Sequence, residues 1–177
     1  MITATPRPAT LSPRALHPPG FPMFSVRPAR PGDAAALAAL SRPFARSGAL
    51  RERSPAQYAS QAQDFLVAEA PDGTVEGCLG LSVHPAETPA GRPAAGVLYN
   101  FCVAGHRQGC GMGAQLLHAA LARARDRSVR TLFTATTGSG RLFLRHDFAP
   151  TSPSRAPAAW ARSLDPRRNA TVLARAL

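Results

Sequence analysis

The spacing of apolar residues changes between residues 97 and 124. The segment VLYNFCV, from Val97 to Val103, is rich in β-branched and aromatic residues, which favours a strand. From Met112 onward the apolar residues recur at intervals of three and four positions, which is the period of an amphipathic helix. The helical positions are Leu116, Leu117, Ala120, Leu121 and Ala124. The pattern predicts a strand that passes through a short turn into a helix.

Three glycines occupy this turn. Gly109, Gly111 and Gly113 lie where the strand period gives way to the helix period. Glycine adopts positive φ without steric cost and has no side chain, so a ligand can approach the bare N–H groups at the positive end of the helix dipole. The junction therefore predicts a phosphate-binding helix N-terminus.

Three kinds of phosphate-binding loop compete for these glycines. A Walker loop needs Gly-Lys-Ser/Thr, and the chain contains no lysine. The dinucleotide pattern fits Gly109, Gly111 and Ala114, but the acidic residue expected about 20 residues later is absent from the next strand, RTLFTATT. The acyl-CoA loop, Q/R-x-x-G-x-G/A, matches Gln108, Gly111 and Gly113. A glycine-rich connection that binds no ligand is the remaining alternative.

In this loop the chain resembles the GNAT superfamily of acyl-CoA N-acyltransferases, and the resemblance extends from Phe24 to Leu177. SVRPARPGDAAALAAL is similar to the first strand and helix of that fold, with Asp33 as the helix N-cap. DFLVAEAPDGTVEGCLGLSV reads as a hairpin, and the strand RTLFTATT and a short helix in GRLFLRHDFAP follow the glycine-loop helix. The resemblance implies an α/β fold: a mixed, mostly antiparallel central sheet with splayed fourth and fifth strands, flanked by helices.

Within the superfamily the chain is most similar to the short bacterial amino-acid acetyltransferases that make N-acetylglutamate. The shared features are the loop LRERS at residues 50–54, Gly77-Cys78, the strand LFTATT and the tail RNATVL at residues 168–173. Three residues depart from the family pattern. Val97 stands where a glutamate is usual, Phe143 where a tyrosine acid is usual, and Asp147 where a turn glycine is usual. The resemblance thus implies an intact acyl-donor site and leaves the acceptor open.

The resemblance also implies the residues of the site. The cofactor-binding residues are Phe101, Cys102, Val103, Gln108, Gly109, Cys110, Gly111, Met112 and Gly113. The incoming amine must lose a proton, through water held by Tyr99 or Asn100, or through Glu87, with His84 as a weaker candidate.

An acceptor that bears a carboxylate requires a guanidinium, because arginine binds carboxylate in bidentate geometry. The resemblance places Arg53, in the loop, and Arg168, in the tail, where the similar enzymes bind amino acid, so it implies that these two bind the substrate, with Arg51 as a weaker candidate.

Charge is distributed unevenly along the chain. Residues 1–87 hold eight arginines against seven acids, whereas residues 88–177 hold thirteen arginines against three acids. The basic half carries the predicted cofactor loop, so it would attract CoA phosphates, an acidic acyl carrier protein or RNA. A solvated basic face without a macromolecular partner is the alternative. We expect a small-molecule amine acceptor and consider a carrier protein and a homodimer, whereas nucleic acid is disfavoured.

The cysteines and the proline-rich stretches indicate the cellular compartment and the extent of the folded domain. Cys78, Cys102 and Cys110 fit no zinc spacing and leave an odd count, which indicates a reducing cytoplasm and no metal site. Residues 1–22 contain six prolines and predict a disordered leader, so the GNAT domain is expected at residues 23–177, with no membrane span. The proline-rich stretches 84–93 and 149–166 are predicted loops on the acceptor side.

The expected function is N-acyl transfer, in which an acetyl group moves from acetyl-CoA, or from another acyl thioester, to the amino group of a small amino acid or amino-acid-like acceptor. Two alternatives remain. An acyl carrier protein could be the donor in secondary metabolism, or the chain could be a non-catalytic binding module on this scaffold, as the missing glutamate and tyrosine suggest.

Overall fold

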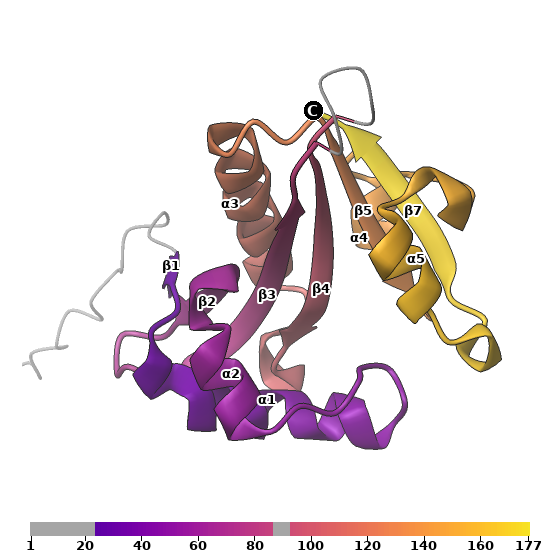
Figure 1. Ribbon diagram of the computed structural model, residues 1–177. Helices are drawn as coiled ribbons and strands as arrows, with labels where there is room; N and C mark the ends of the chain where they lie inside the picture. The colour runs from indigo at the N-terminus through magenta and orange to yellow at the C-terminus, as the bar shows by residue number, and fades with distance from the viewer. Residues whose placement is uncertain (1–23, 87–92) are drawn as a thin grey trace, which may run out of the picture.

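The computed structural model describes residues 24–86 and 93–177, which form a seven-stranded sheet in the order β1-β2-β3-β4-β5-β7-β6 (Figure 1). The strands are β1 (Ser25–Pro28), β2 (Phe65–Glu69), β3 (Val75–His84), β4 (Ala95–Val103), β5 (Thr131–Thr136), β6 (Ala149–Pro150) and β7 (Thr171–Ala176). Neighbouring strands are antiparallel except β4 and β5, which are parallel. The predicted mixed, mostly antiparallel sheet is confirmed.

Helices cover both faces of this sheet. α3 (Met112–Asp126) packs on one face, and α1 (Ala34–Arg46), α2 (Pro55–Ser60) and α5 (Ala158–Ser163) pack on the other (Figure 1). The shorter helical segments are α4 (Arg141–Leu144), η1 (Pro31–Asp33), η2 (Ala62–Asp64), η3 (Gly105–Arg107), η4 (Pro153–Arg155) and η5 (Pro166–Arg168). None of the described helices has the length and apolar character needed to cross a membrane.

The apolar pattern of the glycine-loop helix is confirmed. Every residue that the spacing assigns to the buried face of α3 is buried, together with Met112 at its first position. Strand alternation then decides which side chains meet this helix. On β4, Leu98 packs toward α3, whereas Val97 and Tyr99 face the side of α1, α2 and α5. Val97 and Tyr99 can therefore contact residues of α1, α2 and α5, whereas Leu98 cannot.

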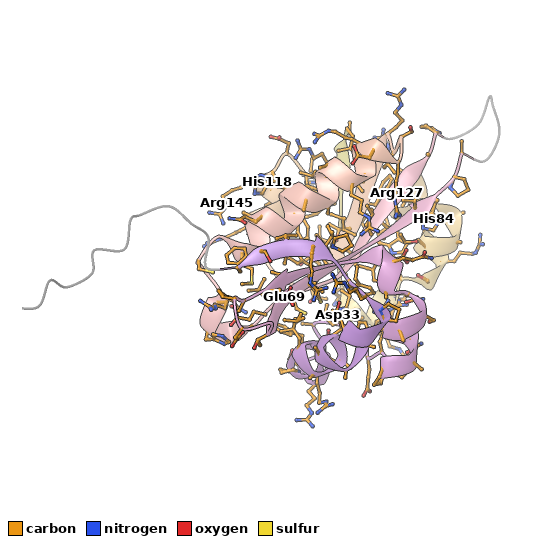
Figure 2. All side chains as sticks on the ribbon, turned by 90° about the vertical axis from the view of Figure 1, so that its left-hand side faces the viewer. Asp33, Glu69, His84, His118, Arg127 and Arg145 are labelled. Atoms are coloured by element: carbon orange, nitrogen blue, oxygen red, sulfur yellow. The ribbon has the colours of Figure 1, made fainter. Side chains whose placement is uncertain are left out.

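The first helix begins differently from the prediction. Asp33 occupies the N-cap position of α1, but its side chain makes no capping bond to that helix. Its carboxylate instead binds Arg27 at 2.8 and 3.0 Å and accepts a hydrogen bond from the Arg30 N–H at 2.7 Å. Arg27 also binds Glu69, so the two acids lie close together (Figure 2). The bidentate pair with the Arg27 guanidinium adds the attraction between two charges, which a bond to a backbone N–H lacks, and the network joins β1, β2 and η1.

Some predictions fall outside the described residues. They are the leader at residues 1–22, the domain start at Met23, the candidate Glu87 and residues 87–92 of the predicted loop at 84–93. The predicted loop at 149–166 is wrong in part, because β6, η4 and α5 lie within it. Pro157 immediately precedes α5, and proline is compatible with the first turn of a helix.

Candidate active site

β4 and β5 separate partway along their length. They pair at three positions, which are Ala95 with Thr131, Gly96 with Leu132 and Val97 with Phe133. Beyond these positions the two strands diverge (Figure 1). Thr134 Oγ1 donates a hydrogen bond to Leu98 O at 3.2 Å, so a side chain takes the place of the first missing ladder bond. The predicted splay is confirmed, and the later residues of β4 have no β5 partner in the described chain.

A β-bulge reshapes β4 beside the splay. Two residues of β4, Asn100 and Phe101, oppose the single β3 residue Leu79. Asn100 has a φ of 49°, which is uncommon for a residue other than glycine. A bulge redirects side chains relative to regular strand alternation. Asn100 consequently points toward α1 and α2, as the preceding residue also does.

Both ends of the Asn100 amide have protein partners. Its Oδ1 accepts hydrogen bonds from Tyr58 OH at 3.1 Å and from Arg53 Nη1 at 3.3 Å. Its Nδ2 donates to Ser41 Oγ at 3.1 Å, and the residue is only 5% exposed. The amide therefore ties the bulge to α1 and α2 and positions the Arg53 guanidinium.

Tyr99 lies across the β3 residue Gly80. A Cβ built on Gly80 would stand 2.7 Å from Tyr99 Cζ, so only glycine leaves room for the ring. The Arg53 guanidinium lies over this ring, 4.9 Å from its centroid. Tyr99 OH donates to Asp64 Oδ2 at 3.1 Å. Burial, reinforced by the Asp64 carboxylate, raises the pKa of Tyr99 well above its ordinary value, so the hydroxyl stays protonated at neutral pH.

The glycine loop presents open backbone at the start of α3. Gly109 and Gly111 have φ values of +84° and +89°, and Gly111 is the N-cap of the helix. A Cβ added at either glycine would meet no atom within 4 Å, so space lies above both. The first N–H groups of a helix have no intrahelical partner, and here they begin at Met112 and Gly113. The loop is therefore suited to bind an anion through its backbone.

The other predicted members of the loop have different surroundings. The Met112 side chain is fully buried in the core, which leaves only its backbone toward the loop. Gln108 Nε2 donates to Val103 O at 3.2 Å, tying the loop to the end of β4. Cys110 is exposed, and its Sγ donates to Arg107 O at 2.8 Å. The loop thus offers N–H groups rather than side chains.

A buried carboxylate, which the sequence analysis missed, fixes the start of the loop. Glu76 on β3 binds Arg107 Nε at 2.7 Å and His106 Nε2 at 3.0 Å, and its carbonyl accepts from Ala104 N at 2.8 Å. The bonds from Arg107, and then those from His106, hold the pKa of Glu76 below its ordinary value against the opposing effect of burial. The sequence did contain a signal for this residue, because Glu76 is an acidic side chain within the otherwise apolar segment that forms β3.

A cavity of about 780 Å³ lies on the face that carries α1, α2 and α5. It brings together four of the predicted site residues, Arg53, Tyr99, Asn100 and Arg168, with Arg51 beside them. Arg168 Nη2 donates to the carbonyl oxygens of Gly48 and Ala49 at 2.8 and 2.7 Å, and Arg51 donates to Ser163 O. These bonds link the loop after α1 to the C-terminal segments across the cavity.

The opposite wall of this cavity is apolar. Trp160 and Leu164, in and after α5, pack with Val97 and Val172. Val97 is 1% exposed, so the position where relatives are expected to carry a glutamate is part of the core. Trp160 was missed because a proline-rich loop was predicted there, although it is the single tryptophan of the chain. Asp64 was missed because it lies at the start of a predicted hairpin strand.

The two other departures are structural. Phe143 is buried between Phe101 and Phe148, with ring centroids 5.7 and 5.4 Å away, so it belongs to the core. Asp147 has a φ of 60°, which fits a left-handed turn position. Among the described residues, no cluster of three histidine, cysteine, aspartate or glutamate side chains could hold a metal ion.

Comparisons with known proteins agree with this geometry. Residues 34–148 match the model of the acetyltransferase (GNAT) family. The amino-acid acetyltransferase of Pseudomonas putida is 31% identical over 152 residues, which cover 86% of this chain and 34% of that protein. The chain spans about a third of the length of the curated relatives it matches.

Solved structures share the fold. N-acetylglutamate synthase from Neisseria gonorrhoeae, complexed with coenzyme A and N-acetyl-glutamate, aligns with a TM-score of 0.78 and 28% identity over 89% of this chain and 36% of that chain. Rv2747 from Mycobacterium tuberculosis, in complex with CoA and NLQ, aligns with a TM-score of 0.72 and 25% identity over 86% of this chain and 99% of that chain. The chain therefore spans nearly all of the second structure and about a third of the first.

Proposed function

This chain belongs to the acetyltransferase (GNAT) family, and from that premise we propose that it transfers an acetyl group from acetyl-CoA to the amino group of a small amino acid or amino-acid-like acceptor. The observation that carries the proposal is the splay of β4 and β5 after Val97. It lies between an open glycine loop at the start of α3 and a cavity lined by three arginines. Donor and acceptor could therefore meet at the exposed edge of β4.

The donor site would be built from backbone. The N–H groups between Gln108 and Gly113 would hold the CoA pyrophosphate, because they lie at a helix N-terminus with open space above Gly109 and Gly111. The β5-facing edge of β4, from Phe101 to Val103, would lie along the pantetheine. The thioester supplies an activated acyl group when CoA is bound.

Transfer requires stabilisation of the oxyanion that forms on the acyl carbon. A backbone N–H near Phe101 or Cys102 is the proposed donor, since the bulge at Asn100 alters the regular strand geometry at this point. Because Asn100 is held by Tyr58, Arg53 and Ser41, its own role would be to fix this backbone. Bringing the amine and the thioester together supplies much of the remaining acceleration.

The acceptor would bind through its carboxylate. Arg53 and Arg168 line the cavity from different segments, and a guanidinium matches a carboxylate in bidentate geometry. The amino-acid ligand of the Neisseria synthase supports an acceptor of this type. Arg51 would add positive charge at the rim.

The amine must lose a proton during transfer, and we assign the route to Tyr99 and Asp64. The protonated Tyr99 hydroxyl donates to the Asp64 carboxylate, and both residues line the cavity. The tyrosine would orient a water or the amine, with Asp64 as the negative group behind it. His84 pairs with Ala95, four β3 positions from Gly80, which is about 13 Å along a strand. It is therefore better placed to contact the far end of an acceptor.

Mass spectrometry of reactions with acetyl-CoA and a panel of amino acids tests the proposal. We expect an acetylated amino acid to form together with free CoA, and at a lower rate with the Tyr99→Phe protein. If calorimetry shows that CoA binds but no acceptor is acetylated, the chain is a binding module and the transferase proposal is wrong.

A further inference from the structure

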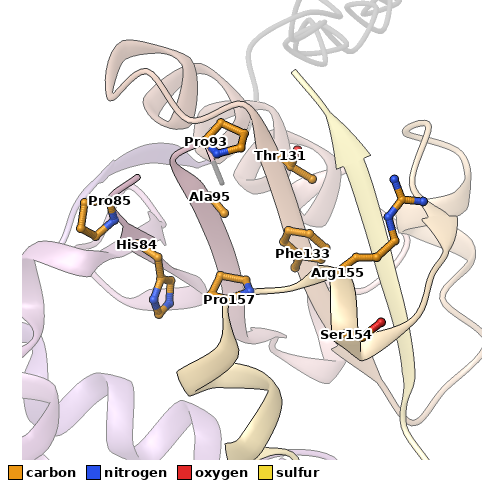
Figure 3. Close-up of a pocket in the computed structure, with 9 residues that line it drawn as sticks. All are labelled: His84, Pro85, Pro93, Ala95, Thr131, Phe133, Ser154, Arg155 and Pro157. Atoms are coloured by element: carbon orange, nitrogen blue, oxygen red, sulfur yellow. The ribbon is translucent and has the colours of Figure 1, made fainter. Parts of the chain in front are cut away.

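A small cavity on the acceptor side and a buried carboxylate on the donor side remain outside the proposed contacts with substrates. The cavity has a volume of about 260 Å³ and is lined by His84, Phe133 and Arg155 together with prolines (Figure 3). This mixture of apolar and basic walls favours no single class of ligand. The carboxylate, that of Glu76, has a more specific setting, because its bonds lead to the segment before the glycine loop.

Glu76 occupies a β-bulge near the start of β3. The residues on either side of it, Val75 and Gly77, pair with consecutive residues of β2, so the pairing skips Glu76. Toward β4, its carbonyl accepts a hydrogen bond from Ala104 N at 2.8 Å, at the point where β4 gives way to η3. A bulge redirects the side chain of its extra residue, and here the carboxylate meets the side chains of η3.

Arg107 connects Glu76 to the glycine loop. Its Nε donates to Glu76 Oε2 at 2.7 Å, and its carbonyl oxygen accepts a hydrogen bond from Cys110 Sγ at 2.8 Å. Cys110 directly precedes Gly111, the N-cap of α3. His106 Nε2 lies 3.0 Å from the second carboxylate oxygen. The guanidinium and the carbonyl of one arginine thus join β3 to the residue before the helix start.

This pairing limits what Arg107 can offer an anion. A basic residue beside a glycine loop would ordinarily be assigned to a phosphate, because a guanidinium binds phosphate oxygens well. Here the bond from Arg107 above all lowers the pKa of Glu76 below its ordinary value, so the carboxylate is charged at neutral pH. The two charges balance, and the carboxylate is 8% exposed beneath a guanidinium that is 25% exposed. The pair therefore adds little attraction for the CoA phosphates.

We propose that Glu76 is a positioning residue for the donor: through Arg107 it holds residues 108–113 in the conformation whose N–H groups bind the CoA pyrophosphate. A loop that is fixed before binding loses less conformational freedom when the ligand arrives, so the anchor raises affinity without touching CoA. Arg107 is then an anchor rather than a phosphate ligand. The inference rests on the proposed function, because it takes residues 108–113 as the donor site.

Calorimetric titration of CoA into a double-mutant cycle tests this inference. Glu76→Gln should bind CoA about threefold to tenfold more weakly, because it replaces a charged acceptor by a neutral one. Arg107→Gln should bind CoA about thirtyfold more weakly, because it leaves a buried carboxylate without its arginine near an anionic ligand. Adding Glu76→Gln to Arg107→Gln removes that charge and should restore the affinity to the level of Glu76→Gln alone.

Glu69→Gln is the matched control. The Glu69 carboxylate likewise accepts from an arginine Nε, that of Arg27 at 2.6 Å, but this pair joins β1 to β2. The control should keep the CoA affinity of the unaltered chain. Without CoA, amide exchange in residues 105–113 should be faster in Glu76→Gln and unchanged in Glu69→Gln, a local effect that a general loss of stability would not produce.

CoA affinity that is unchanged or higher in Glu76→Gln would overturn the inference, as would a double variant that binds CoA no better than Arg107→Gln. Neither Glu76→Gln nor the double variant leaves a buried carboxylate without its arginine, so the test stands even where Arg107→Gln fails to fold. An overturning result alongside acetylation of an amino acid would reject the inference and keep the proposed function. The expected CoA affinities without acetylation of any acceptor would reject the proposed function and keep the inference. If the unaltered chain binds no CoA, both are wrong.

Discussion

The donor side and the acceptor side of the splay are built from different parts of the chain. On the donor side the proposed contacts are backbone N–H groups in one short segment, residues 108–113, while Met112 is turned into the core. On the acceptor side they are side chains from separate segments, such as Arg53 before α2 and Arg168 in η5. A backbone site depends on local conformation, whereas a side-chain site depends on tertiary packing. The two sides should therefore fail in different ways when residues are changed.

The largest expected effect is on the donor side. A β-branched residue at the φ of Gly111, +89°, is strained, so Gly111→Val should turn the loop N–H groups away from the pyrophosphate. Loss of about two charge-assisted hydrogen bonds corresponds to roughly a hundredfold weaker CoA binding by calorimetry. Gly73→Val is the matched control, because Gly73 has a φ of +87° in the β2–β3 turn.

Both variants should lose stability, by about 1–3 kcal/mol for the strained residue. Only Gly111→Val should lose CoA affinity. Equal CoA affinity in the two folded variants would remove the glycine loop from the donor site.

A smaller and more selective effect is expected from the arginines. Arg53→Ala and Arg168→Ala should each raise the KM for the amino-acid acceptor by about tenfold to a hundredfold, since each removes charged hydrogen bonds to the carboxylate. The dissociation constant for CoA should not change. Arg162→Ala is the control, because Arg162 is exposed on α5 and does not line the cavity. A rise in the CoA dissociation constant would mean that donor and acceptor sides are not separate.

Tyr99→Phe should lower kcat by about tenfold, because it keeps the ring under Arg53 but removes the hydroxyl bound to Asp64. The raised pKa of Tyr99 keeps the hydroxyl protonated, so this factor should be the same at every pH from about 6 to 9, below the ordinary tyrosine pKa of about 10. Steady-state kinetics across this range is the measurement. A factor that shrinks as pH rises would show that Tyr99 titrates in the working range.

The smallest effect concerns the nature of the donor. With free acetyl-CoA held mainly by backbone groups, kcat/KM should fall by no more than about threefold as salt is raised to physiological strength, where the Debye length is roughly 8 Å. An acidic acyl carrier protein would lose its association rate sharply over the same series. Arg127 and Arg145, two arginines of the basic residues 88–177, lie apart from each other on the molecule (Figure 2). A carrier that outperforms acetyl-CoA at low salt would reassign the donor.

The contrast between the two sides also explains what the sequence could reveal. Glycine spacing at 109, 111 and 113 acts within one turn, and the positive φ values of Gly109 and Gly111 follow from that local chemistry. The strand-to-helix change in period was readable for the same reason. Arg53 and Arg168 could be singled out only through a family resemblance. Nothing in the sequence around either residue indicates that the two side chains line the same cavity.

Other parts of the site had no readable signal. The ring of Tyr99 needs Gly80 beneath it, and this pairing depends on the register of β3 and β4. Asp64 enters the site through a hydrogen bond to a residue on a distant strand. α5 was hidden by prolines, and its role depends on the packing of Trp160 against Val97. Each of these is a long-range contact, which pattern alone does not determine.

Amide hydrogen exchange with and without CoA is the most direct test of the account. Bound CoA should slow exchange in residues 108–113 of the glycine loop and in residues 99–103 of β4, and should leave exchange in the acceptor loop around Arg53 unchanged. Slower exchange that misses residues 108–113, or that appears only at the arginine cavity, would contradict it.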